Sequence, residues 1–97
     1  MNYEIKLIQS MFIDCNCYLI NYNNKTIIID PCIDVKTLKK YNVNNVEAIL
    51  ITHGHIDHII FLEQLVKEYK CKVYLTKKCL ENCKILIEEY NPSVLEM

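Results

Sequence analysis

A short apolar run leads directly into a cluster of metal-ligating side chains, and this feature restricts the fold of the chain more than any other. Residues 47–51, Glu-Ala-Ile-Leu-Ile, have the length and apolar character of a buried strand. Residues 52–58, Thr-His-Gly-His-Ile-Asp-His, follow at once and hold all three histidines of the chain. Residues just past the end of such a strand line the crevice where open α/β sheets bind ligands. The sequence therefore predicts a ligand site at a sheet edge.

The cluster supplies imidazoles and a carboxylate, which zinc, iron and manganese all accept as ligands. His53 and His55 lie two residues apart in an extended segment, so they point the same way and can bind one ion. Asp57 and His58 come where the chain turns into a helix and can bind a second ion. Two ions about 4 Å apart can share a hydroxide that is nucleophilic at neutral pH. The pattern indicates hydrolysis of a carbonyl or phosphoryl centre, and is too specific for histidines of a polar surface loop.

The remaining periodicity predicts a sheet with helices packed on it. Strands are expected at residues 3–9, 16–22, 25–30, 47–51 and 72–75, with Asn23-Asn24 as a hairpin turn. Three helices are expected. The first follows an N-cap at Asp34 and points Val35, Leu38 and Tyr41 inward. The second starts near Asp57 or His58, with Leu62, Leu65, Val66 and Tyr69 on one face, and the third follows Thr76, with Leu80, Cys83, Ile87 and Tyr90 on one face. This order is an α/β pattern, α+β in some schemes, with a mixed sheet.

Composition excludes several functional classes. The 97 residues suit one domain, and the 11 basic and 12 acidic side chains are spread along the chain. Because there is no basic block, we expect no nucleic-acid partner. No apolar run is long enough to span a membrane, and residues 1–6 lack the pattern of a signal peptide. We therefore expect a cytoplasmic protein with no membrane partner.

The six cysteines have spacings that fit no common metal or redox motif. They stand at positions 15, 17, 32, 71, 79 and 83, without a C-x-x-C pair. In a cytoplasmic chain they are thiols rather than disulfides, and we interpret them as small buried apolar side chains.

Residues 52–58 resemble the metal-binding signature of the metallo-β-lactamase superfamily. The neighbouring segments Asn-Cys-Tyr-Leu-Ile at 16–20 and Ile-Ile-Asp-Pro at 28–31 resemble its glyoxalase II-like branch, and Ile-Leu-Ile at 49–51 resembles the strand before the histidines. The resemblance covers nearly the whole chain, up to Asn91-Pro92. It implies that residues 1–97 form a single partial domain, the N-terminal half of an αββα sandwich, with helices on one face of a mixed sheet.

The resemblance also implies ligands and a reaction. His53 and His55 would bind one metal ion, and Asp57 and His58 a second, in a centre of two zinc ions, with iron or manganese as alternatives. Asp57 would also be the catalytic carboxylate, in hydrolysis of a small-molecule thioester or ester by a metal-bound hydroxide, as in hydroxyacylglutathione hydrolase.

Asp30 and Thr52 would stand behind these ligands and orient them. For Asp30, a turn-forming aspartate before proline fits the local sequence equally well.

The family takes further ligands from later in its fold, whereas this chain has no histidine after His58 and no aspartate after Asp57. Cys32 and the pair Ile60-Phe61 also replace glycines that are usual in the family. Each ion would have two ligands here, while a catalytic zinc usually has three. Three hypotheses stay open: a truncated or split hydrolase, a non-catalytic remnant or metal-binding module that needs a complementing chain, and a small zinc protein using His and Cys.

Two packed sheets bury each other's inner faces. The continuously apolar run at residues 27–29 is typical of a strand covered on both faces. A single sheet would leave residues 27–29 and 49–51 partly uncovered, so we expect a homo-oligomer or a complementing chain.

Overall fold

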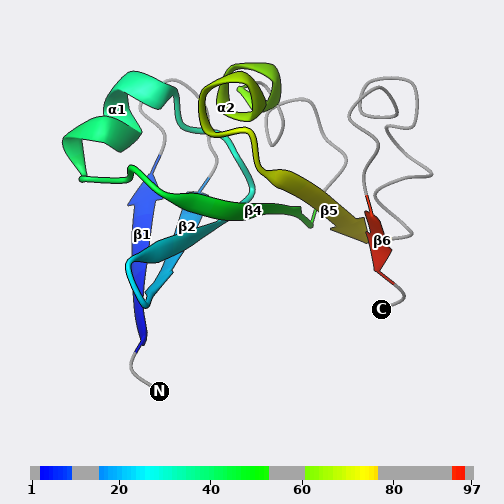
Figure 1. The fold of residues 1–97 in the computed structure, drawn as a ribbon, viewed down its shortest axis with the longest axis horizontal. Coiled ribbons are helices and arrows are strands. Elements are labelled where there is room, and N and C mark those ends of the chain that lie inside the picture. The colour runs from blue at the N-terminus through cyan, green and yellow to red at the C-terminus, as the bar shows by residue number, and fades with distance from the viewer. Residues whose placement is uncertain (1–2, 10–15, 53–60, 77–92, 96–97) are drawn as a thin grey trace.

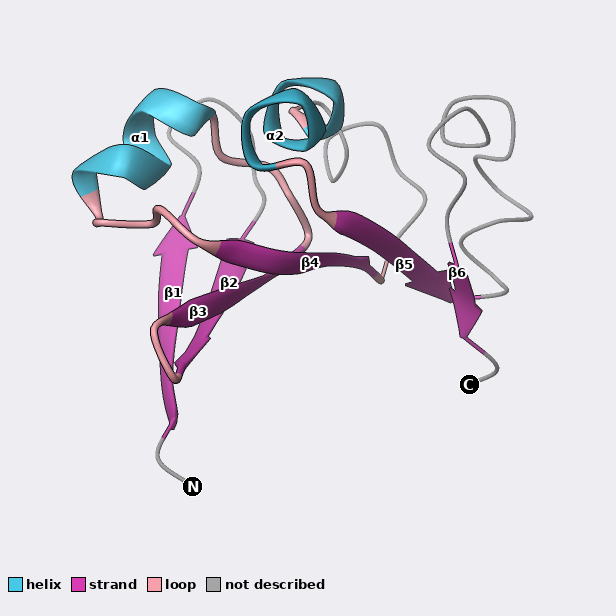
Figure 2. Cartoon of the chain, viewed as in Figure 1, coloured by secondary structure: helices cyan, strands magenta, loops and turns pink. Residues whose placement is uncertain are grey.

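A computed structural model of the chain describes residues 3–9, 16–52, 61–76 and 93–95. These residues form one six-stranded mixed sheet in which the strands follow one another in chain order (Figure 1). Two helices lie on one side of the sheet (Figure 2). The expected fold class, a mixed sheet with helices on one face, is confirmed.

The first half of the sheet is antiparallel. It contains β1 (Tyr3–Gln9), β2 (Asn16–Tyr22) and β3 (Lys25–Ile29), and the first two match the predicted strands in both bounds. Asn23 and Asn24 join β2 to β3 with φ angles of 46° and 63°. Consecutive positive φ angles suit the right-handed twist of a two-residue hairpin, and asparagine tolerates them. The predicted Asn-Asn turn is therefore confirmed.

The second half of the sheet is parallel. β4 (Val46–Ile51), β5 (Lys72–Thr76) and β6 (Ser93–Leu95) extend the sheet from β3 in that order. The sequence did not predict β6, because three residues, Ser-Val-Leu, are too few to show a period. The predicted helix after Thr76 and the predicted helix start near Asp57 lie outside the described residues.

The two helices cover the same face because each crosses between neighbouring parallel strands. α1 (Val35–Lys40) follows β3, and α2 (Leu62–Tyr69) precedes β5. Asp34 occupies the predicted N-cap position of α1, and the predicted inner face of α2 is confirmed, with Leu62 and Leu65 buried. The inward placement of Tyr41 was wrong: α1 ends at Lys40, so Tyr41 is the C-cap and is 47% exposed.

The core lies between the sheet and the two helices. Fully buried side chains of every strand from β2 to β5 meet Leu38 of α1 and Leu65 of α2 there; they include Cys17, Leu19, Ile28, Ile49, Ile51 and Leu75. Cys32 is also buried in this core, so the interpretation of Cys17 and Cys32 as small apolar side chains is confirmed. Cys71 is partly buried against the core, while Cys15, Cys79 and Cys83 lie outside the described residues.

The opposite side of the sheet, which we call the open face, is covered by no described element. Along each strand its side chains alternate with those of the core. They are largely apolar and partly or fully exposed: Tyr3, Ile5, Leu7, Tyr18, Ile20, Ile27, Ile29, Leu50 and Tyr74. Within the described residues β3 is therefore covered on one face, and its cover on the second face stays a prediction. Ile28 is buried, whereas its neighbours Ile27 and Ile29 are partly exposed, as expected for one sheet alone.

No helix in the described part of the chain has the length and apolarity needed to cross a lipid bilayer.

Candidate metal centre

In the sequence, the predicted ligands come shortly after the carboxyl end of β4. β4 ends at Ile51, and Thr52 is the last described residue before the cluster. His53, His55, Asp57 and His58 lie outside the described residues, so their roles as ligands stay predictions. Among the residues that the structure does describe, no three His, Cys, Asp or Glu side chains lie close enough to hold a metal ion.

Asp30, at the end of the neighbouring strand, holds Thr52 with both carboxylate oxygens. The backbone N–H of Thr52 donates to Asp30 Oδ1 over 2.8 Å, and the Thr52 hydroxyl donates to Asp30 Oδ2 over 2.6 Å. Asp30 is 5% exposed and Thr52 is half-buried, so this pair of bonds is partly buried. Hydrogen bonds to a charged group in such a setting are worth about 1.5–3 kcal/mol each. The ends of β3 and β4 are thus locked together one residue before His53.

The backbone of Asp30 is itself unusual. Its φ is 59°, although Pro31 follows and favours extended backbone in the residue before it. Its N–H donates to Leu50 O over 2.8 Å, and its own carbonyl accepts from Cys32 N over 2.8 Å. A non-glycine residue in this region costs about 1–3 kcal/mol and tends to occur at functional sites. The two interpretations of Asp30 are therefore compatible, because it turns the chain and also holds Thr52.

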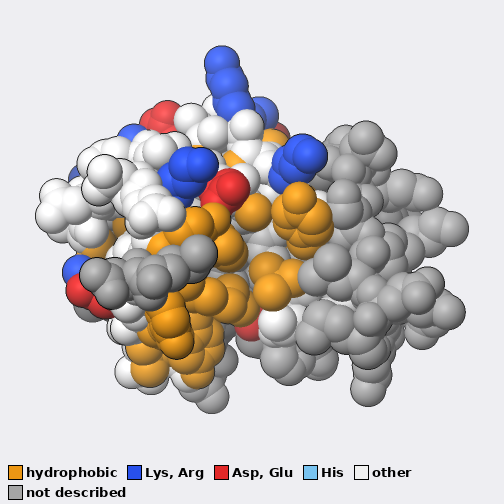
Figure 3. All heavy atoms as spheres, turned by 60° about the horizontal axis from the view of Figure 1, so that its bottom comes forward, with side chains coloured by type: hydrophobic (Ala, Val, Ile, Leu, Met, Phe, Trp, Pro, Cys, Tyr) orange, Lys and Arg blue, Asp and Glu red, His pale blue; other side chains and the backbone are white. Residues whose placement is uncertain are grey.

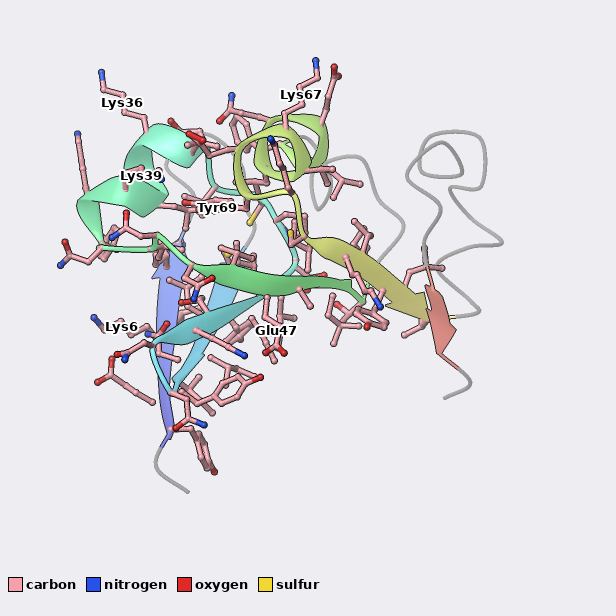
Figure 4. All side chains as sticks on the ribbon, viewed as in Figure 1. Lys6, Lys36, Lys39, Glu47, Lys67 and Tyr69 are labelled. Carbon is pink, nitrogen blue, oxygen red and sulfur yellow. The ribbon has the colours of Figure 1, made fainter. Side chains whose placement is uncertain are left out.

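The chain resumes after the cluster in α2, and two contacts fix that helix. The N–H of Val35, in α1, donates to Gln64 Oε1 of α2 over 2.6 Å. At the other end of α2, the Tyr69 hydroxyl donates to Val43 O over 2.7 Å, and burial raises the pKa of this phenol. Figure 4 shows Tyr69 on the sheet side of the helices and Lys36 and Lys67 pointing away. The contact of Gln64 has no signature in the sequence, because an exposed glutamine on a helix carries no signal of a tertiary hydrogen bond.

The donor set of the cluster fits a metal site at this place. Imidazole and carboxylate are the ligand types of zinc, iron and manganese, and the fixed ends of β3 and β4 provide a rigid base for them. The carboxylate of Asp30 lies against Thr52, the residue that precedes the cluster in the sequence, and a negative charge near the ligands favours a cation.

Comparison with known proteins decides the family. Residues 11–80 match the family model of the metallo-beta-lactamase superfamily. This chain belongs to that superfamily. The matched residues include β2, β3, β4 and α2 together with the whole histidine cluster, so the predicted resemblance is confirmed.

The relatives of this chain include a hydroxyacylglutathione hydrolase and a metal-dependent hydrolase. The chain is 42% identical over 53 residues to the hydroxyacylglutathione hydrolase of Buchnera aphidicola. This alignment covers 53% of this chain and 21% of that protein. It is 41% identical over 59 residues to a UPF0173 metal-dependent hydrolase of Geobacillus thermodenitrificans, covering 59% of this chain and 26% of that protein.

Two solved structures have the same fold. The B3 metallo-beta-lactamase BLEG-1 superposes with a TM-score of 0.66 at 30% identity, over 77% of this chain and 38% of that one. A diphosphatase of the PhnP family superposes with a TM-score of 0.67 at 16% identity, over 96% of this chain and 49% of that one. The chain therefore spans about half or less of these structures and about a quarter of the two relatives.

Proposed function

We propose that this chain carries part of the metal centre of a hydrolase, with His53 and His55 on one zinc ion and Asp57 and His58 on a second. The observation that carries the proposal is the pair of hydrogen bonds from Thr52 to Asp30. They fix the backbone that leads into the ligands, and such supporting contacts are a general requirement of metal sites. The family and the metal-dependent relatives support the same assignment.

The proposed substrate is a small-molecule thioester or ester, from the similarity to hydroxyacylglutathione hydrolase. When bound, such ions supply polarisation of a carbonyl oxygen and lower the pKa of a coordinated water to near 7. The chain's own contribution is positional: Asp30 anchors Thr52, and Gln64 and Tyr69 fix the helix after the cluster. Asp57 is proposed as the carboxylate needed for turnover. We place this reaction in the cytoplasm, without a nucleic-acid or membrane partner.

A second candidate function is a metal-binding module that does not turn over substrate by itself. It is favoured by the ligand count, since these 97 residues offer each ion two of the proposed ligands. A catalytic zinc usually has three protein ligands and an open position. In this case activity needs further polypeptide that completes the site.

Equilibrium dialysis against zinc, with metal quantified by mass spectrometry, tests the metal site. We expect His53→Ala and His58→Ala each to lower zinc affinity by at least about tenfold, and Asp30→Asn to lower it about 10- to 100-fold. Asp34→Asn is the matched control, because the Asp34 carboxylate makes no capping hydrogen bond and should leave affinity unchanged. Zinc binding that is equal in the wild type, His53→Ala and His58→Ala would overturn the proposal.

Hydrolysis of a hydroxyacylglutathione separates the two candidate functions. Activity of the zinc-loaded chain that disappears in Asp57→Ala, with the fold intact by circular dichroism, would support the hydrolase. Zinc binding without activity would support the module.

A further inference from the structure

One short segment, residues 30–35, is hydrogen-bonded to the chain on both sides of the proposed ligand cluster. Before the cluster, Asp30 accepts from the N–H and from the hydroxyl of Thr52. After the cluster, the N–H of Val35 donates over 2.6 Å to Oε1 of Gln64 in α2. The described residues on the two sides of the cluster are therefore tied to the same piece of backbone.

The segment itself is well restrained. Pro31 and Cys32 are fully buried, and Ile33 is 4% exposed. The ring of Pro31 fixes its own φ angle, and the N–H of Cys32 donates to the carbonyl of Asp30 over 2.8 Å. A buried segment with an internal hydrogen bond can set the positions of the two residues that it holds relative to each other.

The bond to Gln64 takes the place of an N-terminal cap on α1. The first amides of an α-helix have no partner within the helix, and the side chain of Asp34 at the N-cap position makes no capping hydrogen bond. Instead, the first amide of α1, that of Val35, donates to Gln64, which lies in the first turn of α2. The bond therefore acts on the end of α2 that is nearest to the ligands in the sequence.

Apolar packing alone does not fix this end of α2 as closely. Leu62 and Leu65 are buried in the core, but hydrophobic burial is non-directional. A hydrogen bond, by contrast, restricts both a distance and an angle. The two helices lie on the opposite side of the sheet from the hydrophobic side chains that Figure 3 shows on the open face, so the contact of Gln64 with Val35 does not depend on what covers that face.

Given the function proposed above, on which this step rests, we propose that Gln64 is a positioning residue for the ligand pair Asp57 and His58. Each residue between an anchored position and a ligand adds two rotatable backbone dihedral angles, so an anchor restricts the nearest ligands most. Thr52 lies next to His53 in the sequence and positions the first ligand pair, whereas Gln64 is closer to His58 than to any other ligand. Residues 30–35 give both pairs a common frame.

Hydrogen exchange of the metal-free chain, followed by NMR, tests the contact itself. Gln64→Ala should make the Val35 amide exchange at least about threefold faster, because the amide loses its acceptor. Gln64→Glu keeps an acceptor oxygen and should keep the slow exchange. Glu68→Ala, at another exposed position of α2, is the matched control and should leave the Val35 amide unchanged. A Val35 amide that exchanges equally fast in the wild type and in Gln64→Ala would overturn the proposal.

Zinc dialysis in two backgrounds tests the assignment to one ligand pair. In the His53→Ala background, which keeps the second pair intact, Gln64→Ala should lower zinc affinity about three- to tenfold, since it removes one exposed hydrogen bond. In the His58→Ala background the same change should alter affinity by less than about twofold. Thr52→Val, which removes the hydroxyl bonded to Asp30, should show the opposite preference.

The outcomes separate this role from the proposed function. If both histidine variants lower zinc affinity but Gln64→Ala lowers it equally in the two backgrounds, or in neither, the positioning role of Gln64 is overturned and the metal centre stands. An equal loss in both backgrounds is the result expected of a residue that only stabilises the fold. Zinc binding that neither histidine variant lowers would overturn the metal centre and the role of Gln64 together.

Discussion

The two faces of the sheet are built from the same strands and nearly the same side chains, yet they have opposite environments. On β3, Ile28 is fully buried under the helices, whereas Ile27 and Ile29 on the open face are partly exposed. On β4, Ile49 and Ile51 are buried and Leu50 is half-buried. Both faces of this sheet are therefore apolar enough to be buried, while the described part of this chain covers one of them.

The largest expected effect is a difference in unfolding free energy between two neighbouring isoleucines of β3 that lie on opposite faces of the sheet. Ile28→Ala should lower the free energy of unfolding by about 2–5 kcal/mol, because it opens a cavity in a close-packed core. Ile27→Ala should cost about 1 kcal/mol, since its side chain is partly exposed already. Urea unfolding of the two variants measures both losses. Equal losses would show that the open face is covered within one chain and would break the comparison.

Much of this fold was predictable because its signals are local. Alternation located β1 and β2, and Asn23-Asn24 located the turn, since each depends on neighbours in sequence. Tyr41 was misplaced because the end of α1 is not encoded by the apolar period, and β6 was missed because pairing with β5 decides it. Exposure of Ile27 depends on what packs on the sheet, which no local pattern contains.

The sequence predicts the candidate site as a composition and a position, with Asp30 and Thr52 as its support, and the ligand roles stay predictions. The structure describes the approach to the site, where Asp30 and Thr52 are in contact. Their hydrogen bonds could not be derived from sequence spacing, because they join residues 22 positions apart. The contact arises from the parallel pairing of β3 with β4.

A second comparison concerns two aspartates four residues apart. Asp30→Asn should lower the free energy of unfolding by about 1.5–3 kcal/mol, because the buried carboxylate accepts two hydrogen bonds and asparagine tolerates the positive φ. Asp34→Asn should change it by less than about 0.5 kcal/mol. Thermal or urea unfolding of both variants checks this. If the two variants lose the same stability, the hydrogen bonds between Asp30 and Thr52 do not contribute measurably to the free energy of unfolding.

A smaller loss of stability is expected where the end of α2 is held by the Tyr69 hydroxyl. Tyr69→Phe should cost about 1 kcal/mol below pH 10, because it removes the bond to Val43 O. The pKa of Tyr69 is raised in the folded state, so its stabilising contribution is present below the ordinary phenol pKa and is lost as pH rises through the raised value. The stability difference between wild type and Tyr69→Phe should therefore shrink in alkaline solution. Exposed Tyr41→Phe, measured alongside, should show no loss of stability at neutral pH.

X-ray absorption spectroscopy of the zinc-loaded chain tests the central claim most directly, because it reports the ligand atoms themselves. We expect nitrogen and oxygen ligands at about 2.0–2.2 Å from the zinc, with the scattering pattern of imidazole. In His53→Ala and His58→Ala the imidazole contribution should fall, while Asp34→Asn leaves the spectrum unchanged. A first shell dominated by sulfur at about 2.3 Å would place the zinc on cysteines and contradict the account.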